Sequence, residues 1–100
     1  MKRITRICAA LAVALAMTPV VAQQPIKIVG LVELSGTGAT SGTNFDNGVK
    51  LAVKEINAAG GILGRQVSYT SSDTQSNPGV AKALAQKAVD DGAYVVMGPV

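Results

Sequence analysis

The sequence contains no histidine, a single cysteine and only three aromatic residues among its 100 residues. Without histidine, the chain cannot build a His-dependent catalytic triad or a His-ligated metal centre. Cys8 lies in an apolar N-terminal run, so it offers the remaining residues neither a disulfide nor a reactive thiolate. Gly-Lys-Ser and Gly-Lys-Thr are also absent, which excludes a P-loop. We therefore expect no catalytic residue, no metal and no cofactor.

Positive charge is concentrated at the N-terminus. Lys and Arg outnumber Asp and Glu by nine to six, but three of the nine basic residues lie within the first six positions. Eleven uncharged residues (7–17) follow, too few for the run of about 20 that spans a membrane. This order predicts a secretory signal peptide, 1–22, cleaved after Ala22, and export to the periplasm. Residues 23–100 then carry six charges of each sign, so no nucleic-acid partner is expected.

Hydrophobic patterning predicts three strands alternating with two helices. Strands are expected at 26–34, 66–71 and 94–97, where β-branched and aliphatic residues gather. The order strand, helix, strand, helix, strand predicts an α/β fold, a parallel βαβαβ unit with right-handed crossovers.

The helix boundaries are predicted from capping residues. Thr43 is expected to cap the first helix, which ends at Gly60. Asn77 is expected to cap the second, with a proline at its first position and Gly92 at its end. Asp46, Lys50, Lys54 and Asn57 are expected away from the buried face of the first helix. The residues predicted to form that face are Phe45, Val49, Ala52, Val53, Ile56 and Ala59.

Several segments resemble, in order and spacing, the type I periplasmic solute-binding proteins of the branched-chain amino acid transporter class. These segments are Ile26-Lys27-Ile28, Leu34-Ser35-Gly36, Asn47-Gly48, residues 51–65, residues 73–78 and Gly98-Pro99. The resemblance implies a Rossmann-like lobe with strand order 2-1-3, incomplete here, with residues 23–100 as its N-terminal part and the second lobe absent. It also implies that the two lobes close on an amino acid or a related carboxylate, which an ABC permease in the inner membrane then receives.

Small and hydroxyl residues fill the segment after the first strand, residues 35–43. Its glycines let the main chain approach a ligand, and its neutral hydroxyls lie near a helix N-terminus, where a carboxylate is favoured. Neutral donors hold such a group without the desolvation of a buried counter-charge. Of this segment we expect Thr40 and Ser41 to contact the ligand.

Ser41 also departs from the family pattern, because relatives commonly place an aromatic residue there that covers the ligand. Without that aromatic surface, packing on a small aliphatic side chain is reduced. An aromatic carboxylate or another amino acid is therefore expected as an alternative to leucine, isoleucine or valine.

Four other side chains invite functional interpretations. Glu33 and Asp73 lie near strand ends but have no nucleophile between them, so surface or loop-capping roles are expected. Tyr69 and Tyr94 lie in apolar strand patterns, which predicts packing within the fold and no contact with a ligand.

Two other functions remain open. A ligand-sensing domain of a receptor would share this fold without transporting its ligand. A secreted Rossmann-like oxidoreductase is the weaker alternative, because Gly36 and Gly38 are followed by Ser41 at the third glycine position of the dinucleotide fingerprint. The protein is accordingly expected not to be an enzyme.

Overall fold

The structure of the protein is a computed structural model, which describes residues 23–100. The expected signal peptide, 1–22, lies outside the described residues. Five elements follow one another as the sequence predicts: β1 (Ile26–Val32), α1 (Ala39–Ala58), β2 (Val67–Asp73), α2 (Pro78–Asp90) and β3 (Val95–Met97). Within residues 23–100, neither helix is both long enough and apolar enough to cross a membrane.

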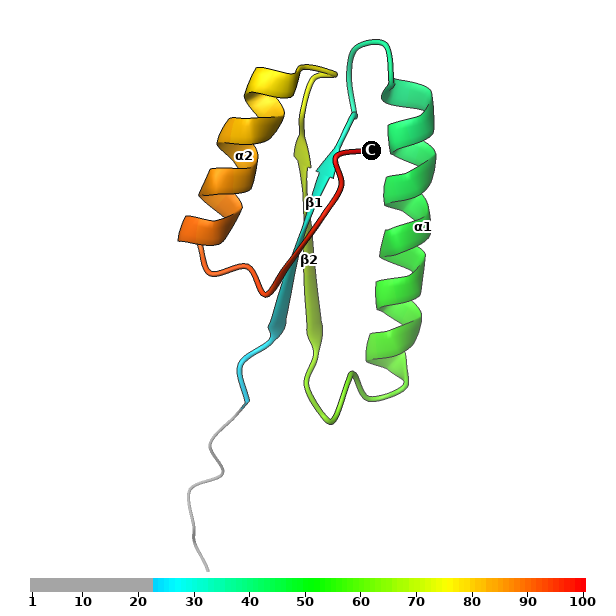
Figure 1. The fold of residues 1–100 in the computed structure, drawn as a ribbon. Helices are drawn as coiled ribbons and strands as arrows, with labels where there is room; N and C mark the ends of the chain where they lie inside the picture. The colour runs from blue at the N-terminus through cyan, green and yellow to red at the C-terminus, as the bar shows by residue number, and fades with distance from the viewer. Residues whose placement is uncertain (1–22) are drawn as a thin grey trace, which may run out of the picture.

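The three strands form one parallel sheet in the order β2-β1-β3, which confirms the expected arrangement. β1 pairs along its whole length with β2, and its centre pairs with β3. α1 lies on one face of the sheet and α2 on the other (Figure 1). Because all strands run the same way, their carboxyl ends meet at one edge.

The core on the α2 side is small and aliphatic. Val29 and Leu31 of β1 pack there with Ala88 of α2, and all three are buried. β1 is the central strand and has a helix over each face, which is why its sequence is almost continuously apolar. The partly buried side chains packed around this cluster are Leu84, Ala85, Ala93 and Val96.

The beginning of α1 differs from the prediction. The helix begins at Ala39, with Gly38 at the N-cap and no side-chain cap, and Thr43 lies inside the helix. Gly42 explains the shift, because a Cβ at this buried position would overlap the main-chain carbonyl oxygen of Glu33. Its hydrogen atom lets the first turns of the helix lie directly against the chain leaving β1.

The predicted ends of both helices and the start of α2 are confirmed. Asn77 Oδ1 accepts hydrogen bonds from the amides of Gly79 at 2.8 Å and Val80 at 3.2 Å. Gly60 and Gly92 follow α1 and α2 with φ angles of 102° and 82°, conformations that favour glycine.

The buried face of α1 is rotated from the predicted one. Of the predicted residues, Phe45, Val49 and Val53 are partly buried, and the exposed ones are Ala52, Ile56 and Ala59. Asp46, expected off this face, is 3% exposed. At the far end, Asn57 donates to Val67 O and accepts from Val67 N, both at 2.8 Å. The side chains of Asp46 and Asn57 thus bond to β2 from α1, although the apolar pattern predicts both away from the buried face of the helix.

Asp46 is held by two partners. Tyr69 of β2 donates its hydroxyl hydrogen to Asp46 Oδ1 at 2.8 Å, and Lys50 Nζ lies 2.7 Å from Oδ2. A side chain at Gly30 would collide with the Tyr69 hydroxyl, so this glycine makes room for the pair. Burial alone would raise the pKa of Asp46, but the Lys50 and Tyr69 hydrogen bonds outweigh it and lower the pKa.

The two tyrosines differ in their surroundings. Tyr69 packs between β2 and α1, as predicted, and burial followed by the hydrogen bond to Asp46 raises the pKa of its hydroxyl. Tyr94 was expected to pack within a strand, but it precedes β3 and is 75% exposed. The prediction for Tyr94 is wrong because β3 is an edge strand of the described sheet, with only three residues.

Candidate functional site

The chain segments that leave β1 and β3 meet at the carboxyl edge of the sheet. Glu33 N donates to Val100 O at 2.6 Å, and Val100 N donates to Leu31 O at 3.1 Å. In an open α/β sheet, ligands bind at this edge, where the chain leaves neighbouring strands toward opposite faces. The strand order reverses beside β1, because α1 leads from β1 outward to β2, whereas α2, on the opposite face, leads from β2 back past β1 to β3 (Figure 1).

Asp73, at the end of β2, accepts hydrogen bonds that hold the loop after β1 in place. Its Oδ1 accepts from the amides of Leu34 at 3.0 Å, Ser35 at 3.2 Å and Gln75 at 2.8 Å. Its Oδ2 accepts from Ser35 Oγ at 2.6 Å. The Ser35 hydroxyl, followed by the amide of Gln75, lowers the pKa of Asp73. These bonds confirm the predicted loop-capping role.

Ser76 joins the loops after β1 and β2 a second time. Its hydroxyl donates to Ser35 O at 2.8 Å and accepts from Gly38 N, at the start of α1, at 3.0 Å. The sequence analysis missed this role, although Gly36 indicates the close approach: a Cβ there would overlap the Ser76 side chain.

Thr40 and Ser41 lie in the first turn of α1, not in a loop as the sequence suggested. Both are exposed, and within residues 23–100 neither hydroxyl makes a side-chain hydrogen bond. They lie one turn from the carboxyl edge, on a helix whose N-terminus has no side-chain cap. Their hydroxyls are therefore free to bond to a solute, and their contact with a ligand stays a prediction.

Glu33 is the acidic group of this edge, and the sequence analysis assigned it no binding role. Its carboxylate lies against Gly38, so close that a Cβ on Gly38 would overlap it. Across residues 23–100 the ion pairs join Lys50 to Asp46 and Lys87 to Asp91, so Glu33 has no basic partner there. The N-terminus of α1, expected to favour a ligand carboxylate, thus already has a carboxylate beside it.

A small pocket of 140 Å³ opens beside Glu33. Thr74 from the exit of β2, Pro78 at the start of α2 and Pro99 from the exit of β3 line it as well. Thr74 is 1% exposed, and its Oγ1 has no hydrogen-bond partner among residues 23–100. The pocket is therefore bordered by a carboxylate that has no basic partner within residues 23–100 and by a threonine whose hydroxyl oxygen is buried.

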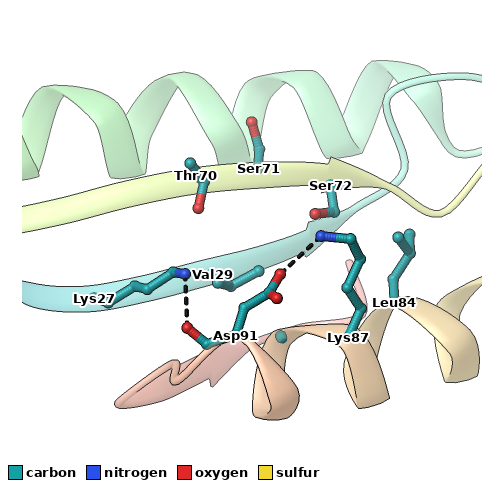
Figure 2. Close-up of a pocket in the computed structure, with 9 residues that line it drawn as sticks. Lys27, Val29, Thr70, Ser71, Ser72, Leu84, Lys87 and Asp91 are labelled. Atoms are coloured by element: carbon teal, nitrogen blue, oxygen red, sulfur yellow. Dashed lines mark hydrogen bonds and ion pairs between the residues drawn. The ribbon is translucent and has the colours of Figure 1, made fainter.

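A larger pocket of 330 Å³ lies between α2 and the sheet. Figure 2 shows Lys27 and Lys87 both reaching Asp91, at 2.9 Å to its main-chain oxygen and 2.7 Å to its carboxylate. Thr70 and Ser72 point into it, whereas Ser71 points toward α1 (Figure 2). The charged groups of this pocket bond to one another, so we interpret them as structural contacts that hold the C-terminal end of α2 against the sheet.

Metal-binding side chains do not gather anywhere in the described part of the chain: residues 23–100 contain no cluster of three or more His, Cys, Asp or Glu groups. The candidate site is therefore built from one carboxylate, neutral hydroxyls and main-chain groups.

Residues 25–100 match the family described as periplasmic binding protein. A Leu/Ile/Val-binding protein, BraC3 of Rhizobium johnstonii, is 39% identical over 92 residues, which are 92% of this chain and 25% of that protein. A chemotactic signal transduction substrate-binding protein, BasB of Halobacterium salinarum, is 37% identical over 82 residues, 79% of this chain and 20% of that protein.

A solved structure extends this likeness to three dimensions. It is the branched-chain amino acid transporter substrate-binding protein LivJ of Streptococcus pneumoniae in complex with isoleucine, with a TM-score of 0.73 and 39% identity over 75% of this chain and 22% of that one. The chain spans about a fifth to a quarter of the length of the relatives it matches.

Proposed function

Since the chain belongs to the periplasmic binding proteins, in their branched-chain amino acid class, we propose that it captures an amino acid or related carboxylate for an ABC-type transporter. One observation carries the proposal: the β1 and β3 exits meet at one edge, within a segment that matches this family from residue 25 to residue 100. Solute binding at such an edge needs no reacting group, and we accordingly propose that the protein is not an enzyme.

The proposed organisation combines the N-terminal charge and apolar pattern with the same membership. Residues 1–22 act as a signal peptide cleaved after Ala22, and residues 23–100 form the N-terminal part of the first lobe. The solute then binds in the periplasm between this lobe and a second one, and a membrane permease receives it. Lobe closure stabilises the bound state only through contacts to both lobes.

The experiment that tests this function is a titration of the proposed two-lobed protein, purified from a periplasmic extract, with leucine, isoleucine, valine, phenylalanine and 3-phenylpropionate. We expect one or more of them to bind saturably with 1:1 stoichiometry in isothermal titration calorimetry. Residues 23–100 alone are expected to bind the same solute far more weakly, because they supply one side of the site. Tight binding by residues 23–100 alone would contradict the two-lobe mechanism, and no binding by the two-lobed protein would contradict the function.

Thr40 and Ser41 are proposed to hydrogen-bond the solute. Removing one hydroxyl, in Thr40→Val or Ser41→Ala, is expected to weaken binding about 3- to 10-fold, the equivalent of one neutral hydrogen bond. Thr43→Val is the matched control, because Thr43 is an exposed hydroxyl farther along the same helix. Equal losses at Thr40 and Thr43 would show that the effect belongs to the helix and not to contact with the solute.

A second function, ligand sensing without transport, is favoured by one observation, the similarity to the chemotactic substrate-binding protein BasB. Transport and sensing share the binding step, so the titration serves both. Uptake of the identified solute by cells lacking this chain separates them: a transport component is required for uptake, and a sensor is not.

A further inference from the structure

Gln23 lies outside the contacts that hold the start of β1. Residues 23–25 precede this strand, belong to no strand or helix and are exposed. The first contact of this segment is at Gln24, whose main-chain oxygen accepts a hydrogen bond from Arg65 Nε at 3.0 Å. The sheet itself begins at Ile26, whose amide donates to the residue before β2 at 2.8 Å. The side chain of Gln23 is therefore free to rotate, while the chain after it is held.

The proposed cleavage after Ala22 gives Gln23 a second reactive group. Its nitrogen, until then part of a peptide bond, becomes an α-amine, part of which is uncharged and nucleophilic near neutral pH. The side-chain carboxamide of the same residue is an electrophile, and a bond between the two closes a five-membered ring. Well-oriented intramolecular reactions reach effective concentrations of about 10⁵–10⁸ M. Gln23 thus carries both partners of a favourable ring closure.

We propose that Gln23 is a modification site, at which the N-terminus cyclises to a pyroglutamate lactam after the signal peptide is removed. The α-amine nitrogen attacks Cδ of the side-chain amide, so the N–Cδ bond forms and the Cδ–Nε2 bond breaks. One proton passes from the attacking nitrogen to Nε2, which leaves as ammonia. The step needs no oxidant, reductant or second substrate. The inference goes beyond solute binding and rests on the proposed cleavage after Ala22.

The fold permits this reaction at Gln23 and at no later residue of the segment. The ring closes within one exposed residue, so neither the Arg65 contact nor the pairing of β1 has to break. Gln24 has the same side chain, but its nitrogen belongs to a peptide bond and is not nucleophilic. The modification is therefore specific to the first residue after cleavage.

The lactam changes the charge and the protease sensitivity of this end of the chain. It removes the positive charge of the α-ammonium, and residues 23–100 then keep six side-chain charges of each sign. It also leaves no free amine, which aminopeptidases require. Stepwise removal of residues 23 and 24 would delete the oxygen that Arg65 binds. The lactam therefore preserves the contact that holds the chain before β1.

The test is N-terminal sequencing of the exported protein by stepwise chemical degradation, which needs a free amine. The protein is recovered from the periplasm, kept at growth temperature for several days and sequenced without proteolysis. We expect the yield of the first cycle to be at least tenfold below that of an unblocked reference protein. Treatment with pyroglutamate aminopeptidase removes a lactam, and it is expected to restore a sequence that begins at Gln24.

Gln23→Asn is the matched variant. It keeps a neutral amide at the first position, but the corresponding ring would have only four members and would be strained. Its N-terminus is therefore expected to stay readable from residue 23, and a broad-specificity aminopeptidase should shorten it while leaving the cyclised wild type intact. Gln24→Asn changes the second residue only and is expected to become blocked as the wild type does.

The outcomes separate the lactam from the cleavage. A wild type that stays readable from Gln23 overturns the lactam and leaves the proposed cleavage standing. A sequence that begins at another residue overturns both. A block that persists in Gln23→Asn, or after treatment with the enzyme, is not a lactam and overturns the proposal.

Neither result depends on solute binding. Gln23 precedes the amino end of β1, whereas the candidate site lies where this strand ends (Figure 1). The titrations that test the proposed function can therefore fail while the lactam forms, and they can succeed while it does not.

Discussion

Replacing Gly42 by alanine is expected to destabilise the fold by at least about 1–3 kcal/mol, the usual cost of forcing extra atoms into a packed site. The obstacle is main chain, because the new Cβ would overlap the carbonyl oxygen of Glu33. No side-chain rotation relieves such a contact, so α1 has to move away from the exit of β1. The measurement is urea unfolding of the full chain, followed by circular dichroism.

Gly48 provides the matched control within the same helix. A Cβ at Gly48 meets nothing within 4 Å, and the residue is exposed. Alanine there is expected to stabilise the protein by about 0.5–1 kcal/mol, because glycine is disfavoured in helix interiors. Opposite signs at the two positions would locate the effect at the helix–strand contact, and stabilisation at both would refute that contact.

The second large effect is expected at Asp46. Asp46→Ala removes the acceptor of the Tyr69 hydroxyl and leaves that hydroxyl without its partner, at an expected cost of about 1.5–3 kcal/mol for a hydrogen bond to a charged group. Tyr69→Phe removes the same bond from the other side. In a double-mutant cycle the two losses should be clearly less than additive, whereas additive losses would mean that the residues do not interact.

The same carboxylate predicts how stability changes with pH. The pKa of Asp46 is lowered in the folded protein, so its contribution to stability is fully present above the ordinary carboxyl pKa of about 3.9. That contribution is lost as the pH falls below this value and through the lowered pKa of the folded state. Unfolding between about pH 5 and pH 2 should therefore depend less on pH in Asp46→Ala than in the wild type.

A second ion pair serves as the control for Asp46. Lys87 and Asp91 also lie four residues apart on a helix turn, with the same 2.7 Å separation as Lys50 and Asp46. The Asp91 side chain is 47% exposed, however, against 4% for Asp46. Solvent screens the exposed pair, so Asp91→Ala is expected to destabilise the protein much less than Asp46→Ala.

Features that depend on neighbouring residues in the sequence were predictable. β1 follows from a continuous aliphatic run, and the start of α2 follows from Asn77 beside a proline. Gly60 and Gly92 end the helices because each adopts a positive φ within a local turn. In each case the physical cause lies within a few residues.

Features that depend on residues far apart in the sequence were not predictable from it. The burial of Asp46 requires Tyr69, 23 positions away, and the empty space at Gly30. The early start of α1 requires Gly42 to lie on the carbonyl of Glu33. Helical periodicity ranks positions by their own polarity, so it cannot anticipate a partner that another segment supplies.

The candidate site was only partly predicted, because some of its contacts also join residues from distant segments. The edge followed from the βαβ order, and the loop-capping role of Asp73 was anticipated. The position of Glu33 against Gly38 was not, because it depends on how the chain turns after β1. Glycines four apart, at 38 and 42, are the signal in the sequence that indicates such a close approach.

The hydrogen bonds that Asp73 and Ser76 make to the loop after β1 also affect the thermodynamics of solute binding. Fixing the main chain of a flexible residue costs about 1–2 kcal/mol in conformational entropy. Here five hydrogen bonds, three to the loop amides of Leu34, Ser35 and Gly38 and two with Ser35 Oγ and O, hold the loop before any solute arrives. A solute that contacts this edge therefore meets a preorganised surface, and the entropy of ordering the loop belongs to folding and not to association.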